Sequence, residues 1–266
     1  MLMSRIFSAF IMLTVFLSSL FLFSGKFFPY IIYVSSLLAL YEWSKLLQFN
    51  AQQKNIFLFS SAILVYFIGR YLSDDNGRLI LVLASIFWVF VAPLFLIFSP
   101  KLKNFLAGTL IGWLLVIPLI VSFNYLINLG PWIVLLVLTA IWLADSGAYF
   151  FGKQFGKRRL APSISPGKTW EGFFGAILVV TLFSITMVYF GFVTAYSSIL
   201  FFNLILILSV EGDLFESYIK RMAKVKDSGD LIPGHGGVLD RIDSLCSSLP
   251  LATLILISPS FFGKII

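Results

Sequence analysis

Acidic and basic side chains are concentrated in one short stretch of an otherwise apolar chain. Residues 211–244 hold seven of the twelve carboxylates and five of the nineteen lysines and arginines, although charged residues make up only 12% of the 266 residues. Carboxylate oxygens are ligands for hard divalent cations, and ammonium and guanidinium groups bind phosphates. The composition of this stretch therefore predicts chemistry on phosphate groups.

Part of the stretch has the spacing of one helix face. Asp213, Ser217, Lys220 and Lys224 follow one another at intervals of four, three and four residues, and side chains at such intervals lie on the same side of a helix. A carboxylate, a hydroxyl and two ammonium groups would then line one wall of a site, provided that the helix continues to Lys224.

A further helix is predicted after a tight turn at residues 233–237, which include three glycines. This helix would carry Asp240 and Asp243 on one face, with Arg241 beside them. We predict Asp213, Asp240 and Asp243 as metal ligands, because Mg²⁺ is usually held by one or two carboxylates together with substrate phosphates. The alternative is that these acids form ordinary surface salt bridges.

The only histidine, His235, lies inside this turn. It could act as a general base, since imidazole titrates near neutral pH. It could equally cap the helix that follows or donate a hydrogen bond to a phosphate.

A second polar segment spans residues 145–172. Asp145 stands at the end of an apolar run, where an unpaired carboxylate is costly and usually faces a site or a partner. Several glycines are expected to let backbone N–H groups approach a ligand closely; they are Gly147, Gly152, Gly156 and Gly167.

The end of this segment has the features of an anion site. Ser165, Lys168 and Thr169 precede a helix whose start Glu171 would mark. Hydroxyls, an ammonium group and a helix N-terminus together favour bound phosphate. The basic run at residues 157–159 either belongs to this site or is a topology signal that contacts lipid headgroups.

The elements that must position these groups are membrane helices. The chain is 59% hydrophobic and contains repeated apolar runs near 20 residues, the length that crosses a bilayer as a helix. We therefore predict an all-α, polytopic integral membrane bundle. A single cysteine excludes an intramolecular disulfide. The nine predicted spans are residues 4–24, 27–45, 56–73, 79–99, 105–127, 131–150, 172–193, 197–216 and 245–263.

The basic residues predict the orientation of this bundle. With nine spans, fifteen of the nineteen lysines and arginines fall on the side that also holds both charged segments. Because cytoplasmic loops carry the excess of basic residues, the N-terminus and both charged loops are expected on the cytoplasmic side. The protein itself is expected in the inner membrane of a cell. The net charge of +7 is explained in this way, and nucleic acid is not an expected partner.

The spans divide into two predicted regions. Residues 1–128 would form a scaffold of about five spans, and residues 129–266 a catalytic region of about four spans with the two charged loops. In the scaffold, Glu42 lies in or near an apolar run. It either faces a polar pocket or extends from the bundle to the membrane interface.

Two sets of residues resemble one enzyme family. The run from Ser217 through Lys220-Arg221 and Lys226-Asp227 to Pro233-Gly-His-Gly-Gly237 and Asp240-Arg241-x-Asp243 resembles the signature of phosphatidate cytidylyltransferases. Asp145-Ser-Gly-Ala-Tyr149 and Ser165-Pro-x-Lys168-Thr169-x-Glu171-Gly172 resemble a second segment shared by that family. The resemblance covers the chain from Asp145 to Ser244.

The resemblance implies a polytopic, dimeric enzyme that joins CTP and phosphatidic acid, releases pyrophosphate and needs Mg²⁺, with K⁺ as a companion ion. It implies that Asp213, Asp240 and Asp243 hold the metal. The residues expected to act in catalysis are Ser217, Lys220, Arg221, Lys226, Asp227, His235 and Arg241. The residues expected to bind substrate are Asp145, Ser165, Lys168, Thr169, Glu171, Gly236 and Gly237.

Two other functions fit parts of the sequence. A CTP-dependent kinase of a polyprenyl or phytyl alcohol would use a hydroxyl nucleophile, which would make a base such as His235 more useful. A transporter for an anionic solute would use the charged loops as a gate. Transporters usually bind their solutes near the membrane midplane and often contain repeats, whereas the charges here lie at the predicted cytoplasmic end.

Overall fold

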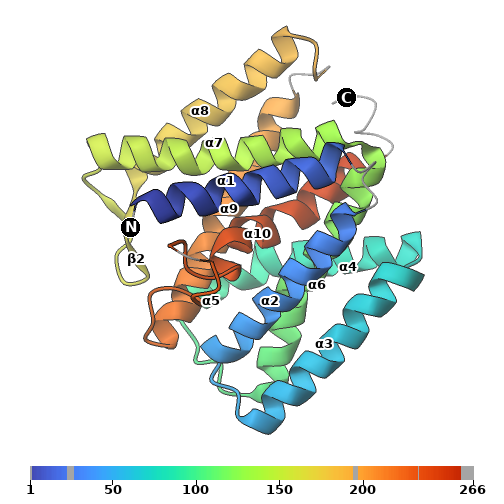
Figure 1. Ribbon diagram of the computed structural model, residues 1–266. Coiled ribbons are helices and arrows are strands. Elements are labelled where there is room, and N and C mark those ends of the chain that lie inside the picture. Colours follow the sequence, from blue (N-terminus) through green and yellow to red (C-terminus); the bar gives the residue numbers. More distant parts are fainter. Residues whose placement is uncertain (1, 23–26, 194–196, 233, 259–266) are drawn as a thin grey trace.

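The computed structural model describes residues 2–22, 27–193, 197–232 and 234–258. Figure 1 shows the helices that make up almost all of this part of the chain. They are α1 (Leu2–Phe21), α2 (Phe28–Leu46), α3 (Ala51–Tyr71), α4 (Asp74–Ile86), α5 (Ala92–Phe98), α6 (Phe105–Leu129), α7 (Pro131–Phe155), α8 (Trp170–Tyr189), α9 (Ser197–Met222) and α10 (Leu239–Leu256).

Helices α4 and α5 form one continuous segment through a π-helical turn, η1 (Phe87–Val91). Pro93 lies two residues after the end of this turn, and proline in a helix removes a backbone hydrogen bond. Counted in this way, each of the nine predicted spans contains one helical segment of the described chain. The ends of the first and last predicted spans lie outside the described residues.

The predicted fold class, an all-α polytopic membrane bundle, is confirmed. Five segments within the described residues are long and apolar enough to cross a membrane; they are Asp74–Phe98, Phe105–Leu129, Pro131–Phe155, Trp170–Tyr189 and Ser197–Met222. The number of nine crossings stays a prediction.

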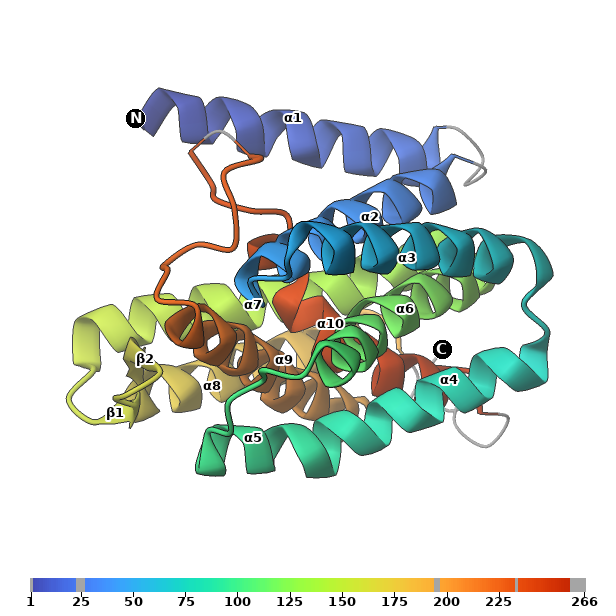
Figure 2. The same cartoon turned by 90° about the horizontal axis from the view of Figure 1, so that it is seen from below.

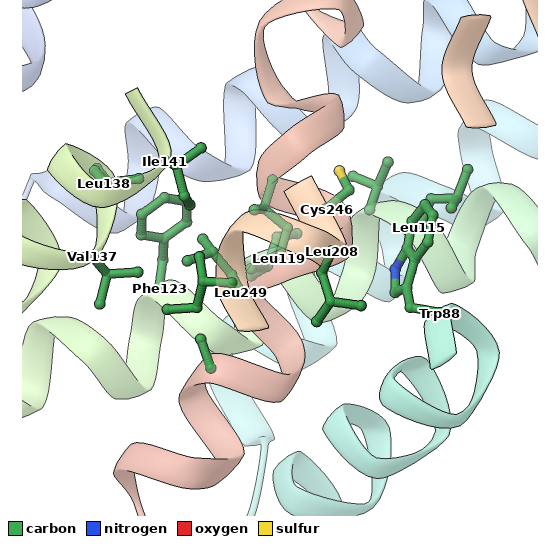
Figure 3. Close-up of a cluster of buried hydrophobic side chains, with 14 of the residues drawn as sticks. Trp88, Leu115, Leu119, Phe123, Val137, Leu138, Ile141, Leu208, Cys246 and Leu249 are labelled. Atoms are coloured by element: carbon green, nitrogen blue, oxygen red, sulfur yellow. The ribbon is translucent and has the colours of Figure 1, made fainter. Parts of the chain in front are cut away.

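One hydrophobic core runs through both predicted regions. Figure 3 shows side chains from η1, α6, α7, α9 and α10 that converge in it, among them Trp88, Leu119, Ile141 and Leu208. The single cysteine, Cys246, is buried in the same cluster. Because α10 packs against α2, α4 and α6 as well as against α9, the C-terminal helix is built on the N-terminal half of the chain.

Small residues bring α7 and α8 into close contact. A Cβ atom on Gly172 would lie 2.6 Å from the carbonyl oxygen of Ala148, and one on Gly147 would lie 3.2 Å from the Cα atom of Ala176. The prediction that Gly147 and Gly152 present backbone N–H groups to a ligand is wrong, because both lie inside α7, where the helix uses these groups. Their role is packing, which small residues permit between membrane helices.

Two short strands interrupt the helical pattern. β1 (Arg159–Ala161) pairs antiparallel with β2 (Ser165–Thr169), and the sequence did not predict this hairpin. Thr169 ends β2 and begins α8, where its hydroxyl accepts a hydrogen bond of 3.1 Å from the backbone N–H of Gly172. The hairpin is thereby fixed to the first turn of α8.

Helix α9 extends past the predicted end of its span at residue 216 and ends at Met222. The shared face is therefore confirmed for Asp213, Ser217 and Lys220. The prediction that Lys224 shares this face is wrong, because Lys224 lies beyond the end of the helix in a left-handed conformation with a φ of 60°.

Candidate active site

Three carboxylates from α9 and α10 form a cluster. Single oxygen atoms of Asp213, Glu216 and Asp243 all lie within 4.8 Å of one another. The two helices approach closely here because Gly212 has no side chain: a Cβ atom at that position would lie 2.5 Å from the backbone oxygen of Asp243. Two of the three predicted metal ligands are thus brought together, and the third member of the cluster, Glu216, was not predicted.

The remaining predicted ligand, Asp240, lies outside this cluster and is bound by other groups. Its Oδ1 atom is 2.6 Å from the ammonium nitrogen of Lys220. Its Oδ2 atom accepts hydrogen bonds from the backbone N–H of Ser228 and of Gly237. Burial opposes ionisation of Asp240, but the hydrogen bond from Lys220 and those from the backbone N–H groups outweigh it and hold the pKa of this carboxyl below its usual value.

Lys220 joins Asp240 to the acidic cluster. Its ammonium nitrogen is also 2.5 Å from Oε2 of Glu216, one turn earlier on α9. Lys220 and Glu216 are only 9% and 4% exposed, so each needs its partner, since an isolated buried charge is strongly unfavourable. The second oxygen of Glu216, Oε1, is buried and has no hydrogen-bond partner.

The hairpin segment reaches this cluster through Lys168. The Lys168 ammonium nitrogen lies 2.6 Å from Oδ2 of Asp213 and 3.3 Å from the backbone oxygen of Val210. A cavity of about 440 Å³ opens at this contact, between α7, α8, α9 and the hairpin. The predicted site residues that line it are Asp145, Ser165, Lys168, Thr169 and Asp213.

A second cavity, of about 570 Å³, lies along the segment between α9 and α10. Within the described residues the predicted turn is confirmed: Ile232 and Gly236 form a bridge, and Gly234 and Gly236 have φ values of 78° and 86°, which glycine adopts without strain. Pro233 lies outside the described residues. The predicted site residues along this cavity are Lys226, Asp227, His235, Gly236 and Arg241.

The side chains of this turn are held by neighbouring elements. Arg241 donates a hydrogen bond of 3.0 Å to the backbone oxygen of His235. The Nδ1 atom of His235 is 2.8 Å from the hydroxyl oxygen of Ser8 on α1, and Figure 2 shows this segment rising from the bundle to the N-terminal half of α1. His235 is therefore placed by α1, an element that the sequence did not connect with the site.

Other predicted site residues have partners within the protein. Arg221 donates hydrogen bonds to the backbone oxygens of Ile164 and Val225, which ties the hairpin to the end of α9. Glu171 accepts hydrogen bonds from the backbone N–H groups of Lys157 and Arg158. Ser217 donates to Asp213 at 3.4 Å.

The cluster fits a hard divalent cation. It offers three carboxylates, one of which has a buried oxygen without a partner, and oxygen ligands of this kind suit Mg²⁺ or a similar ion. Without a cation, like charges at this separation would oppose one another and raise the energy of the folded state. The geometry therefore supports the general prediction of a metal site while replacing Asp240 with Glu216.

The chain belongs to the cytidylyltransferase family, whose model matches residues 3–258. The chain is 34% identical to a phosphatidate cytidylyltransferase of Pseudomonas aeruginosa, over 96% of this chain and 97% of the relative. It is 35% identical to an enzyme of the same name from Haemophilus influenzae, over 94% and 96% of the two chains. A Staphylococcus aureus enzyme of that name is 46% identical over 47% of this chain and 48% of its own length. The predicted family is confirmed.

Proposed function

We propose that this chain transfers CMP from CTP to phosphatidate, giving CDP-diacylglycerol and pyrophosphate. The family and the relatives that match nearly its whole length support this nucleotidyltransferase activity. The structural observation that carries the proposal is the ion pair between Lys168 and Asp213, which joins the two charged segments. It adjoins the acidic cluster, in which Lys220 pairs with Glu216 and also with Asp240.

The reaction needs alignment and charge neutralisation more than proton transfer. A phosphate oxygen of phosphatidate attacks the α-phosphorus of CTP, a new P–O bond forms, and the bond to the leaving pyrophosphate breaks. A phosphate monoester is largely ionised at neutral pH, because its second pKa is about 6. The nucleophile therefore needs no strong base, and His235, which contacts Ser8, is proposed to shape the turn.

The chain neutralises and orients the two polyanions. Bound Mg²⁺, held by Asp213, Glu216 and Asp243, would supply positive charge to the reacting phosphates. We propose Mg²⁺ as this ion and K⁺ as its companion. Lys220 keeps Glu216 and Asp240 in place, and positioning together with fixed charge supplies most of the rate acceleration in phosphoryl transfer.

The lining of the two cavities suggests which substrate each takes. The larger one is lined by Lys226, Arg241 and a glycine-rich turn, which suits the triphosphate of CTP. The smaller one combines Lys168 with apolar residues such as Leu160 and Phe173 between membrane helices. It suits a lipid phosphate whose acyl chains remain in the bilayer.

The setting of the enzyme is part of the same proposal. The relatives named above are bacterial, and the five apolar segments fit a membrane, so we propose the inner membrane. The distribution of basic residues supports cytoplasmic placement of the N-terminus and both charged segments. A homodimer follows from the family resemblance alone.

The experiment is an assay of purified protein with CTP labelled at the α-phosphorus, Mg²⁺ and phosphatidate. Labelled CDP-diacylglycerol is the expected product. With CTP labelled at the γ-phosphorus and an added polyprenol, label on the alcohol would instead indicate the lipid kinase. Absence of either product, together with uptake of an anion into vesicles, would indicate a transporter.

A further inference from the structure

Glu42 on α2 is a buried carboxylate far in the sequence from the proposed site. It has no exposed surface, and its two oxygens accept three hydrogen bonds. The backbone N–H of Val238 donates at 3.0 Å, the backbone N–H of Leu239 at 2.8 Å and the hydroxyl of Ser228 at 3.1 Å. A carboxylate from the N-terminal half thus holds the segment that leads into α10.

These bonds supply acceptors for backbone N–H groups at the start of α10. The first N–H groups of a helix have no partner within the helix, and a side-chain oxygen usually accepts from them. Val238, the residue at the start of α10, supplies no such side-chain bond. Glu42, on α2, accepts these hydrogen bonds instead. Its negative charge also lies at the positive end of the α10 dipole.

The segment before α10 is shaped to enclose this carboxylate. A Cβ atom on Gly229 would lie 2.5 Å from Oε1 of Glu42, and a Cβ atom on Gly237 would lie 2.5 Å from Oε2. Any larger residue at either position would therefore collide with the carboxylate. Within the described residues, no lysine or arginine bonds to Glu42, so backbone and hydroxyl donors alone satisfy it.

The opposite side of the same segment holds the site. The backbone N–H groups of Ser228 and Gly237, which adjoin Glu42, donate hydrogen bonds to Oδ2 of Asp240. Asp240 in turn pairs with Lys220, and Asp243 follows one turn later on α10. The short segment that Glu42 holds therefore also sets the positions of both aspartates.

We propose that Glu42 is a positioning residue for the transfer reaction: it fixes the turn and the start of α10 so that Asp240 and Asp243 face the α9 carboxylates. This role rests on the proposed function for its effect on turnover. The local ordering on which it depends can be measured without any reaction.

The test is Glu42→Gln in the purified full-length protein, read first by hydrogen–deuterium exchange. The amide of glutamine replaces one acceptor oxygen with an NH₂ group that faces an N–H donor. We expect amides in residues 228–240 to exchange about tenfold faster, as for a lost buried hydrogen bond, while exchange elsewhere in α2 and α6 is unchanged. Ser36→Ala is the matched control, because Ser36 is buried on the same helix and its hydroxyl has no partner.

Turnover provides the second reading, normalised to folded protein by size-exclusion chromatography. We expect kcat of Glu42→Gln to fall about 10- to 100-fold, the usual loss for groups that orient ligands, with KM for CTP changed much less. Glu42→Asp, which retains the carboxylate, should recover part of the loss. A role in stability alone would lower the yield of folded protein and leave its kcat intact.

Gly237→Ala tests the same contact with Glu42 present, in case Glu42→Gln does not fold. It should accelerate exchange in residues 228–240 in the same way. Unchanged exchange there in either folded variant would overturn the proposal. Faster exchange in the variants, together with a wild-type protein that makes no CDP-diacylglycerol, would instead support the positioning contact and refute the proposed function.

Discussion

At the scale of single residues, the site is defined by which carboxylate meets which cation. Asp240 and Asp243 are three residues apart on α10, yet Asp240 pairs with Lys220 whereas Asp243 joins Asp213 and Glu216. The two aspartates should therefore differ in function. We propose that Asp243 binds the metal ion, whereas Asp240 belongs to the network that holds Lys220.

Glu216→Gln and Asp243→Asn should each weaken divalent-cation binding about 10- to 100-fold or more, because each removes an oxygen ligand from the cluster. Binding is measured directly with Mn²⁺ by electron paramagnetic resonance. Glu211→Gln is the control, since Glu211 lies on the same helix outside the cluster. Equal Mn²⁺ affinities of Glu216→Gln and wild type would indicate that Asp240, and not Glu216, is the third ligand.

Lys220→Ala should cost about 3–5 kcal/mol of stability, the usual loss when one partner of a buried ion pair is removed. It leaves Glu216 and Asp240 buried without their shared cation. Thermal unfolding in detergent measures the stability, and the transfer assay should show a large loss of turnover. Arg159→Ala removes an exposed cation and should have a much smaller effect; equal losses would contradict this assignment.

At the scale of elements, close helix packing brings the two charged segments together. The hairpin is fixed to α8 by Thr169, and α8 lies against α7 through glycines. Lys168 meets Asp213 only because α8 has this position. The contacts between helices thus decide the geometry of the site.

Gly172→Ala should lower both the melting temperature and turnover, because its Cβ atom would lie 2.6 Å from a backbone oxygen of α7. The expected displacement of α8 carries the hairpin and Lys168 away from Asp213. Gly167→Ala is the control for the melting temperature alone, since a Cβ atom there has no neighbour within 4 Å. A melting temperature of Gly172→Ala equal to that of wild type would show that α7 and α8 can separate freely.

At the scale of the whole molecule, one core and one polar network connect helices from both ends of the chain. α2 holds the start of α10 through Glu42, and α1 contacts the turn at His235. The predicted division at residue 128 therefore does not separate the site from the first helices. Anything bound at the α9–α10 cluster should stabilise the whole bundle.

Mg²⁺ should accordingly stabilise the wild-type protein and raise its melting temperature. At a Mg²⁺ concentration one hundred times the dissociation constant, the free energy of unfolding should increase by about 2.7 kcal/mol. Asp243→Asn should be more stable than wild type in a chelator, because it relieves repulsion among three carboxylates. Differential scanning fluorimetry with and without Mg²⁺ measures both effects. A chelator-insensitive wild type would argue against a metal in this cluster.

The sequence by itself determined the membrane class, the helical segments and the family, because apolar run length and local motif spacing are properties of neighbouring residues. It also predicted Asp213, Lys220 and Asp243 as residues of the candidate site, since each lies within such a motif. It did not identify Glu216, which lacked a motif position. It named Glu42 as a residue that faces a polar pocket or the membrane interface, but not the partners of Glu42, which lie nearly 200 residues away. Only the tertiary structure decided these contacts and the pairing of Asp240 with Lys220, because long-range packing chooses among carboxylates that are alike in local sequence.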